Sequence, residues 1–338
     1  MPAHLRPVRI ATRGSALALA QAHQVLALCR TAFPKRTFEL RILKTTGDRR
    51  QAVSMAKPDA KLPKGLFTKE LEAALLRGDA DFAVHSLKDL PTELPDGLRL
   101  AAVLPREDPR DVLVLRAADL PKRRTRPEGF DPLSLLKRGA TVATSSTRRA
   151  AQLLRARPDL KIVEIRGNVP TRLQKLARDG AFDATILAAA GLARLGITRD
   201  ARGVLQCPPA LADAAWPQPV VGEFLDLDRM LPAPGQAAIG LECRSGDRST
   251  AAVCRRLNHP ETLACVQAER AFLAGFGGGC QSPLAALARL RRGRVELSTI
   301  AFEAGAVWAE RASDAAARAI PLGRRLGRLA RQALLQGK

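Results

Sequence analysis

The chain has 338 residues, a length typical of two or three domains, and its 46% of apolar residues excludes disorder throughout. Aromatic residues make up only 4%, with no tyrosine, which argues against a base-stacking surface for single-stranded nucleic acid. The formal net charge of +22 leaves two interpretations open. It marks either a solvated arginine-rich surface or an anionic partner, which would be nucleic acid or an acidic small molecule.

The first half of the chain alternates strand-like and helix-like segments. Strands are predicted over 8–12, 38–44, 82–85, 98–104 and 112–115, and helices over 15–32 and 66–76. After a basic, proline-rich loop at 118–138, the alternation resumes with strands over 141–144, 161–165 and 184–188 and helices over 147–156 and 169–178. Such βαβ alternation predicts an α/β fold with mostly parallel, doubly wound sheets.

The last third follows a different pattern. Proline-rich stretches at 208–219 and 232–234 are expected to be chain crossings rather than regular elements. From residue 239 onward, helices are predicted over 248–257 and 261–274, strands over 284–290 and 294–302, and a final amphipathic helix from about 315 to 335. This order predicts a smaller C-terminal α+β domain.

The six cysteines form no C-x-x-C pair, so we expect no zinc site, no other metal and no disulfide framework. They fit free thiols in a reducing cytosol. His23 and Gln24 interrupt the apolar N-terminal stretch, which therefore lacks the core of a signal peptide. No apolar run approaches the ~20 residues needed to cross a bilayer. We expect a cytoplasmic protein with no membrane partner.

Three segments combine a strand end, a small polar residue and arginine at the start of a helix. Free N–H groups and the helix dipole make such a terminus an anion site, although Ser or Asn there serves equally well as a simple cap. Arginine adds a bidentate fork for carboxylate or phosphate. In open α/β sheets these termini face one crevice, so a multi-anion pocket is predicted. Its candidate residues are Arg13, Ser15, Ser145, Ser146, Arg148, Arg149, Arg166, Gly167, Asn168 and Arg172.

Lys88 and Asp89 follow the predicted strand 82–85 and lie at its carboxyl edge. They form either a surface ion pair of little energetic consequence or a functional pair. In the second interpretation Asp89 stabilises a developing cation and Lys88 binds a carboxylate. Acid–base chemistry falls to a carboxylate because the chain has four histidines and no tyrosine. His85 is interpreted as a semi-buried structural group in the strand.

Two further segments fit a role at the pocket. The polar, basic stretch 46–64 is long enough to be a mobile lid, with a disordered surface loop as the alternative. Cys280 follows three glycines, which remove side chains and let the backbone approach a ligand. This thiol is a nucleophile, a covalent tether or an incidental cysteine.

Taken together in their order, these strings resemble the porphobilinogen deaminase (hydroxymethylbilane synthase) family. The resemblance covers nearly the whole chain. The matching strings are I-A-T-R-G-S at 10–15, K-G-L-F at 64–67, V-H-S-L-K-D at 84–89, R-E-D-P-R-D at 106–111, T-S-S-T-R-R at 144–149, R-G-N at 166–168, L-P-A-P-G-Q at 231–236 and G-G-C-Q at 278–281.

The resemblance implies two domains like periplasmic binding proteins and a small α+β domain. We expect the first domain at 1–109 and 211–236, the second at 110–210 and the third at 237–338. The resemblance also implies that Cys280 carries a dipyrromethane cofactor through a thioether and that Asp89 is the catalytic carboxylate. Lys64, Phe67 and Arg194 match further binding positions. The implied enzyme is a monomer that acts on porphobilinogen.

Three departures from the family pattern stand out. Leu62-Pro63 replaces the glycine pair before the lid lysine, Ala237 replaces the second glycine of Gly-Gln-Gly, and residues 211–230 form a longer crossing with no assigned role. Two other functions remain as alternatives. An anion-sensing binding module would explain the arginines but not Cys280 together with Asp89. A nucleic-acid-binding protein would explain the charge, but no helix-turn-helix or zinc-finger pattern supports specific recognition.

Overall fold

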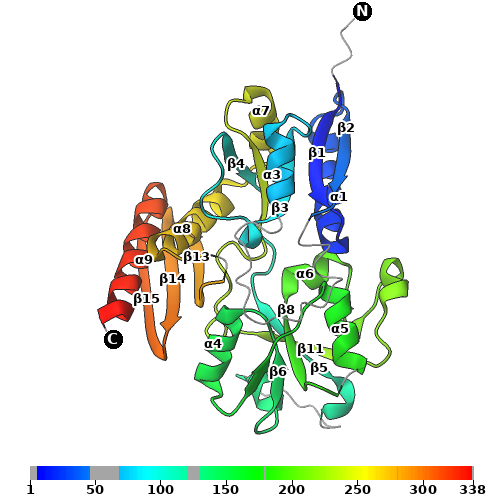
Figure 1. The fold of residues 1–338 in the computed structure, drawn as a ribbon, viewed down its shortest axis with the longest axis vertical. Helices are drawn as coiled ribbons and strands as arrows, with labels where there is room; N and C mark the ends of the chain where they lie inside the picture. Colours follow the sequence, from blue (N-terminus) through cyan, green and yellow to red (C-terminus); the bar gives the residue numbers. More distant parts are fainter. Residues whose placement is uncertain (1–5, 46–67, 121–128, 179, 280, 337–338) are drawn as a thin grey trace, which may run out of the picture.

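The computed structural model describes residues 6–45, 68–120, 129–178, 180–279 and 281–336. They form three units (Figure 1), of which two are α/β domains stacked along the long axis and the third lies to one side. Within the described residues no helix is long and apolar enough to span a membrane.

The first domain contains a five-stranded sheet in the order β2-β1-β3-β12-β4. Its elements are β1 (Val8–Arg13), α1 (Ala16–Ala32), β2 (Phe38–Leu43), α3 (Lys69–Leu76), β3 (Phe82–Ser86), β4 (Leu98–Val103), β12 (Ile239–Arg244) and α7 (Arg248–Leu257). Neighbouring residues of β1 face opposite sides of the sheet, as strand geometry requires. Ile10 joins the core under α1 and α7, whereas Ala11 joins the core under α3. Two helix layers therefore bury both faces.

The second domain repeats this plan with the sheet order β11-β5-β8-β6-β7. Its main elements are β5 (Asp111–Arg116), β6 (Thr141–Ala143), α4 (Thr147–Ala156), β7 (Lys161–Val163), α5 (Val169–Arg178), β8 (Ala184–Ala188), α6 (Ala189–Arg194) and β11 (Val220–Leu225). A small hairpin, β9 (Thr198–Arg199) with β10 (Leu205–Gln206), leads into β11. Each sheet is mostly parallel, as predicted, with one antiparallel strand: β12 in the first and β5 in the second.

The sheet order corrects two of the expected domain boundaries. Segment 211–236 was assigned to the first domain, but β11 pairs with β5 in the second sheet. Segment 237–257 was assigned to the third domain, but β12 lies between β3 and β4 in the first sheet. The chain thus crosses between the domains twice, at 104–110 and at 226–238. Periodicity identifies a strand but not the sheet it joins, and Gly222 and Glu223 interrupt the apolar run of β11.

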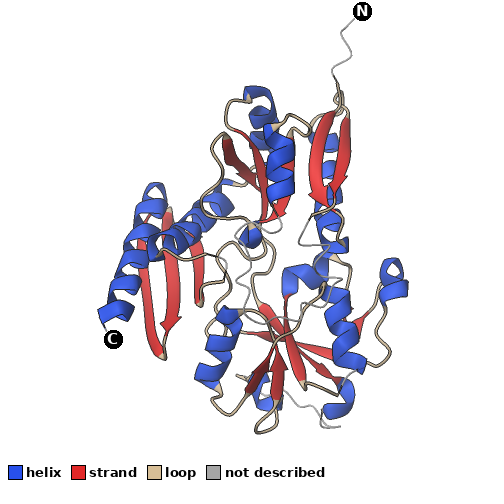
Figure 2. Cartoon of the chain, in the orientation of Figure 1, coloured by secondary structure: helices blue, strands red, loops and turns tan. Residues whose placement is uncertain are grey.

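The third domain is a three-stranded antiparallel sheet with two helices on one face (Figure 2). Its elements are α8 (Pro260–Phe276), β13 (Leu284–Arg291), β14 (Arg294–Glu303), β15 (Ala306–Ala315) and α9 (Ala319–Gln336). Gly323 and Gly327 bring α9 against α8, because a Cβ at either position would collide with a backbone carbonyl of α8. Strand β15 was not predicted, since its residues alternate only between exposed and half-buried positions.

Candidate active site

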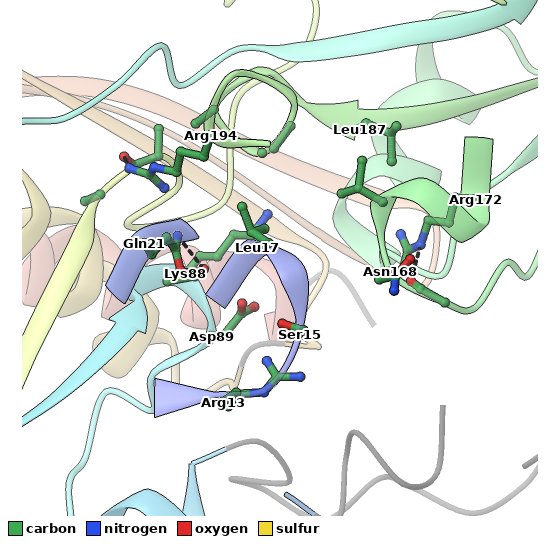
Figure 3. Close-up of a pocket in the computed structure, with 18 of the residues that line it drawn as sticks. Arg13, Ser15, Leu17, Gln21, Lys88, Asp89, Asn168, Arg172, Leu187 and Arg194 are labelled. Atoms are coloured by element: carbon green, nitrogen blue, oxygen red, sulfur yellow. Dashed lines mark hydrogen bonds between the residues drawn. The ribbon is translucent and has the colours of Figure 1, made fainter. Parts of the chain in front are cut away.

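A cavity of about 280 Å³ lies between the first two domains (Figure 3). Segments that are far apart in sequence line it: the start of α1, the residues after β3, the start of α5, helix α6 and the second crossing. Of the predicted residues, the structure brings Arg13, Ser15, Lys88, Asp89, Arg149, Gly167, Asn168, Arg172 and Arg194 to this cavity. Leu17, Gln21, Ser86, Ala237 and Ala238 also line it but were not predicted.

Two of the three predicted helix starts face the cavity. Ser15 caps α1, with its hydroxyl accepting from the Ala18 N–H (3.4 Å). Asn168 precedes α5, and its Oδ1 accepts from the Thr171 N–H (2.9 Å). Both side chains therefore act as caps and also line the cavity. Figure 3 shows Asp89, Ser15 and Arg13 on one side, with Arg172 and Asn168 opposite.

The third helix start has a more structural role. Ser146 caps α4, and the Ser145 hydroxyl donates to the Ile165 carbonyl (2.6 Å). Neither serine lines the cavity, and neither does Arg166, which pairs with Glu164 (2.7 Å). These contacts fix the adjoining ends of β6 and β7 beside the cavity.

Arg148 and Arg149 form a buried cluster around Asp111. Their Nη2 atoms donate to the two oxygens of Asp111 at 2.8 and 2.7 Å, and the Asp111 side chain is fully buried. A third donor, Gln236 Nε2, lies 3.0 Å from Asp111 Oδ1. Burial raises the pKa of Asp111, but the two guanidinium groups outweigh burial and hold that pKa far below its usual range. Only Arg149 of the pair reaches the cavity.

Lys88 and Asp89 sit in a 3-10 turn, η1 (Leu87–Asp89), directly after β3. Burial lowers the pKa of Lys88 to about 8, although neighbouring Asp89 favours the charged form. Asp89 is exposed within the cleft and is the one carboxylate among the described lining residues. Five cationic side chains line the same cavity, so its charge favours a ligand with several anionic groups.

Two of these cations, Arg172 and Arg194, are half-buried and anchored by backbone carbonyls. Arg172 Nε donates to the Gly167 carbonyl (2.8 Å), and Arg194 Nη2 donates to the Ala237 carbonyl (2.6 Å). Burial is the main reason that the pKa of Arg172 falls to about 10, and it also lowers the pKa of Arg194. An anionic ligand would offset the cost of removing these charges from water.

Lys64, Phe67, Cys280 and the expected lid at 46–64 lie outside the described residues. Close to position 280, the Thr147 hydroxyl at the start of α4 donates to the Gln281 carbonyl (2.6 Å). His85 is buried with its Nε2 2.9 Å from Glu242 Oε2, which confirms its structural interpretation. The described residues contain no group of three or more His, Cys, Asp or Glu side chains that could hold a metal ion.

Two family models match the chain. "Porphobilinogen deaminase, dipyromethane cofactor binding domain" covers residues 8–252, and "Porphobilinogen deaminase, C-terminal domain" covers 263–329. Curated relatives with the name porphobilinogen deaminase include those of Moorella thermoacetica, Pelobacter propionicus and Thermus thermophilus. The Moorella protein is 47% identical over 83% of this chain and 78% of its own length. The Pelobacter protein is 45% identical over 86% of this chain and 82% of its own length. The Thermus protein is 44% identical over 85% of this chain and 81% of its own length.

Similar solved structures include the BenM effector binding domain with benzoate and the periplasmic aliphatic sulphonate binding protein SsuA from Escherichia coli. The first has a TM-score of 0.41 and 16% identity, covering 74% of this chain and 90% of its own. The second has a TM-score of 0.39 and 11% identity, covering 80% of this chain and 70% of its own.

Proposed function

The chain belongs to the porphobilinogen deaminase family, and from this premise we propose that it is a hydroxymethylbilane synthase. It would condense four porphobilinogen molecules head to tail, with loss of ammonia, onto a covalently bound primer. Hydrolysis would then release linear hydroxymethylbilane for tetrapyrrole and haem biosynthesis. The observation that carries this proposal is the convergence of five cationic side chains around one carboxylate, Asp89, in the interdomain cavity.

The residues of the cavity fit a dipyrromethane group, which carries several carboxylates. Arg149 and Arg194 each have a buried Nε atom with no hydrogen-bond partner, and both line the cavity. We assign Cys280 as the thioether attachment point. When bound, the group supplies the free pyrrole α-carbon to which the first substrate is joined. Arg149, Arg172 and Arg194 would hold its carboxylates from the second domain.

Asp89 would act on the substrate porphobilinogen. Loss of ammonia from its aminomethyl group leaves an azafulvenium cation, which an adjacent carboxylate stabilises. The same carboxylate can take the proton released when the new carbon–carbon bond forms. Arg13, Ser15 and Lys88 would bind substrate carboxylates, with Lys64 contributing from the expected lid and Phe67 from the residues just after it.

The remaining predicted residues would have supporting or peripheral roles. Because both amino groups of Arg148 are occupied by Asp111 and the Leu231 carbonyl, Arg148 would hold Arg149 in place. Ser145 and Ser146 would order the start of α4, while Arg166 would bind the growing chain at the cavity edge. Gly167 and Asn168 would present the N–H groups at the start of α5.

Intact-mass measurement of the purified protein tests this function. The wild type should carry a dipyrromethane adduct that is absent from Cys280→Ala, and it should turn over porphobilinogen. Asp89→Asn should keep the adduct and lose most turnover. A folded wild type with neither adduct nor turnover would favour the alternative, an anion-sensing module without catalysis.

We also propose that the enzyme works as a monomer in the cytoplasm, without a specific nucleic-acid partner. The five described cysteines are free thiols, which supports a reducing compartment. Any binding to nucleic acid would then be nonspecific and would weaken steeply with salt. Size-exclusion chromatography with light scattering tests the oligomeric state, and a salt titration with duplex DNA tests the nonspecific contact.

A further inference from the structure

The backbone directly after Asp89 is held by an arginine from the third domain. Arg270 lies on α8 and is half-buried. Its Nη1 donates to the Leu90 carbonyl (2.8 Å) and its Nη2 donates to the Pro91 carbonyl (2.6 Å). A guanidinium presents these donors in one rigid plane, so the two bonds fix the orientation of the exit from η1 as well as its position.

The residue before Arg270 connects α8 to both interdomain crossings. Glu269 is fully buried and binds Arg106 of the first crossing through two bonds of 2.6 and 3.1 Å. It also accepts from the Gly235 N–H of the second crossing and from the Ala288 N–H of β13, each at 2.7 Å. This carboxylate therefore anchors α8 to the points where the domains are joined.

The second crossing supports the turn η1 from the other side. The Leu87 N–H donates to the Ala238 carbonyl (3.0 Å). Gly235 lies so close that a Cβ on it would stand 3.1 Å from Leu87 Cγ. The turn that carries Asp89 is thus supported at its start by the crossing that Glu269 holds. At its end it is held by Arg270 itself.

Helix α8 ends at Phe276, and the chain then passes through Gly277 to Gly279 toward position 280. A helix is stiff over this length, so Glu269 and Arg270 relate Asp89 to the segment that leads to Cys280. We propose that Arg270 is a positioning residue for Asp89: with Glu269, it makes α8 the rigid link between the catalytic turn and the third domain. This inference rests on the proposed function, in which Asp89 meets successive substrates while the primer stays tethered.

Arg270→Ala is the main variant, and Arg270→Lys restores one charged donor. Arg244→Ala is a matched control, because Arg244 Nη1 also donates to two carbonyls of the first domain, those of Leu75 (2.6 Å) and Ala80 (2.7 Å), away from the cavity. Each variant is examined for the adduct by intact mass, for kcat and KM, and for hydrogen exchange over residues 87–92.

Arg270→Ala should keep the adduct and lose about 10- to 100-fold in kcat, since displacing a reacting group by about 1 Å costs that much. Its KM should change less than threefold, exchange over 87–92 should rise, and Arg270→Lys should recover part of kcat. Arg244→Ala should lose thermal stability while keeping kcat and exchange over 87–92. Equal kcat losses in Arg244→Ala and Arg270→Ala, or unchanged exchange over 87–92 in Arg270→Ala, would overturn the proposal. A wild type without adduct or turnover would instead refute the proposed function.

Discussion

Replacing Asp111 with asparagine tests whether the Arg148–Arg149 cluster is a structural support. Asp111→Asn keeps the size of the side chain but removes the charge that two buried guanidinium groups share. Breaking a buried pair by removing one partner costs about 3–5 kcal/mol, because the remaining charge is left without compensation. Because two arginines depend on Asp111, we expect the unfolding free energy to fall by about 4–5 kcal/mol or more.

Urea unfolding followed by tryptophan fluorescence measures this loss. Trp216 packs against the core of the second domain and Trp308 against the core of the third, so a Trp308→Phe background isolates the second domain. With an m-value of about 1–3 kcal/mol/M, the midpoint should fall by at least about 1 M. The control Asp119→Asn removes a partly exposed partner of Arg116 and should leave the midpoint unchanged.

The pH dependence gives an independent check. The folded-state pKa of Asp111 is depressed, so its stabilisation is complete above the unfolded pKa of about 4 and is lost as pH falls toward the folded value. The difference in unfolding free energy between wild type and Asp111→Asn should therefore be constant above about pH 5 and should narrow in acid. A midpoint unchanged by the substitution, or a gap that widens in acid, would refute the assignment.

Three smaller substitutions have defined outcomes. Lys88→Met should raise the unfolding free energy by about 1–3 kcal/mol at pH 7 while abolishing turnover. In the wild type the folded-state pKa of Lys88, about 8, lies below its unfolded value. The gain in unfolding free energy of the variant over the wild type should therefore shrink as pH rises from 8 to about 10.5 in urea titrations. Gly235→Ala should cost about 1–3 kcal/mol in the same assay and lower kcat, because Gly235 has φ +73° and presses on Leu87. Ala237→Gly should raise the unfolding free energy by about 1 kcal/mol, because Ala237 has φ +71°, a backbone conformation that glycine adopts without strain. A lower melting temperature would contradict this.

The features that the sequence predicts correctly are those whose chemistry is local. The polar helix starts and the Lys88–Asp89 turn could be predicted because capping and strand-end position depend on neighbouring residues. The alternation of βα units likewise indicated two α/β domains. Ala237 of the second crossing departs from the family's glycine in the sequence alone, and the structure gives it a positive φ.

The parts that could not be predicted depend on contacts between distant segments. Asp111 begins β5, whereas Arg148 and Arg149 lie on α4, so the three residues meet only in the folded chain. No periodicity in the sequence links Asp111 to either arginine. The one available signal was an acidic residue within a conspicuous charged string at 106–111. Similarly, β11 and β12 were not predicted as strands, and only long-range pairing decides which sheet each one joins.

The second domain is inserted between β4 and β12 of the first, which has a consequence for how the chain folds during synthesis. Strand β12 completes the first sheet between β3 and β4, yet it is made after every strand of the second sheet. The second domain therefore has all its strands before the first does. Until residue 244 leaves the ribosome, β3 and β4 each expose an unpaired edge, a state prone to intermolecular pairing. Of the two α/β domains, the one that is translated first is thus the one that finishes folding second.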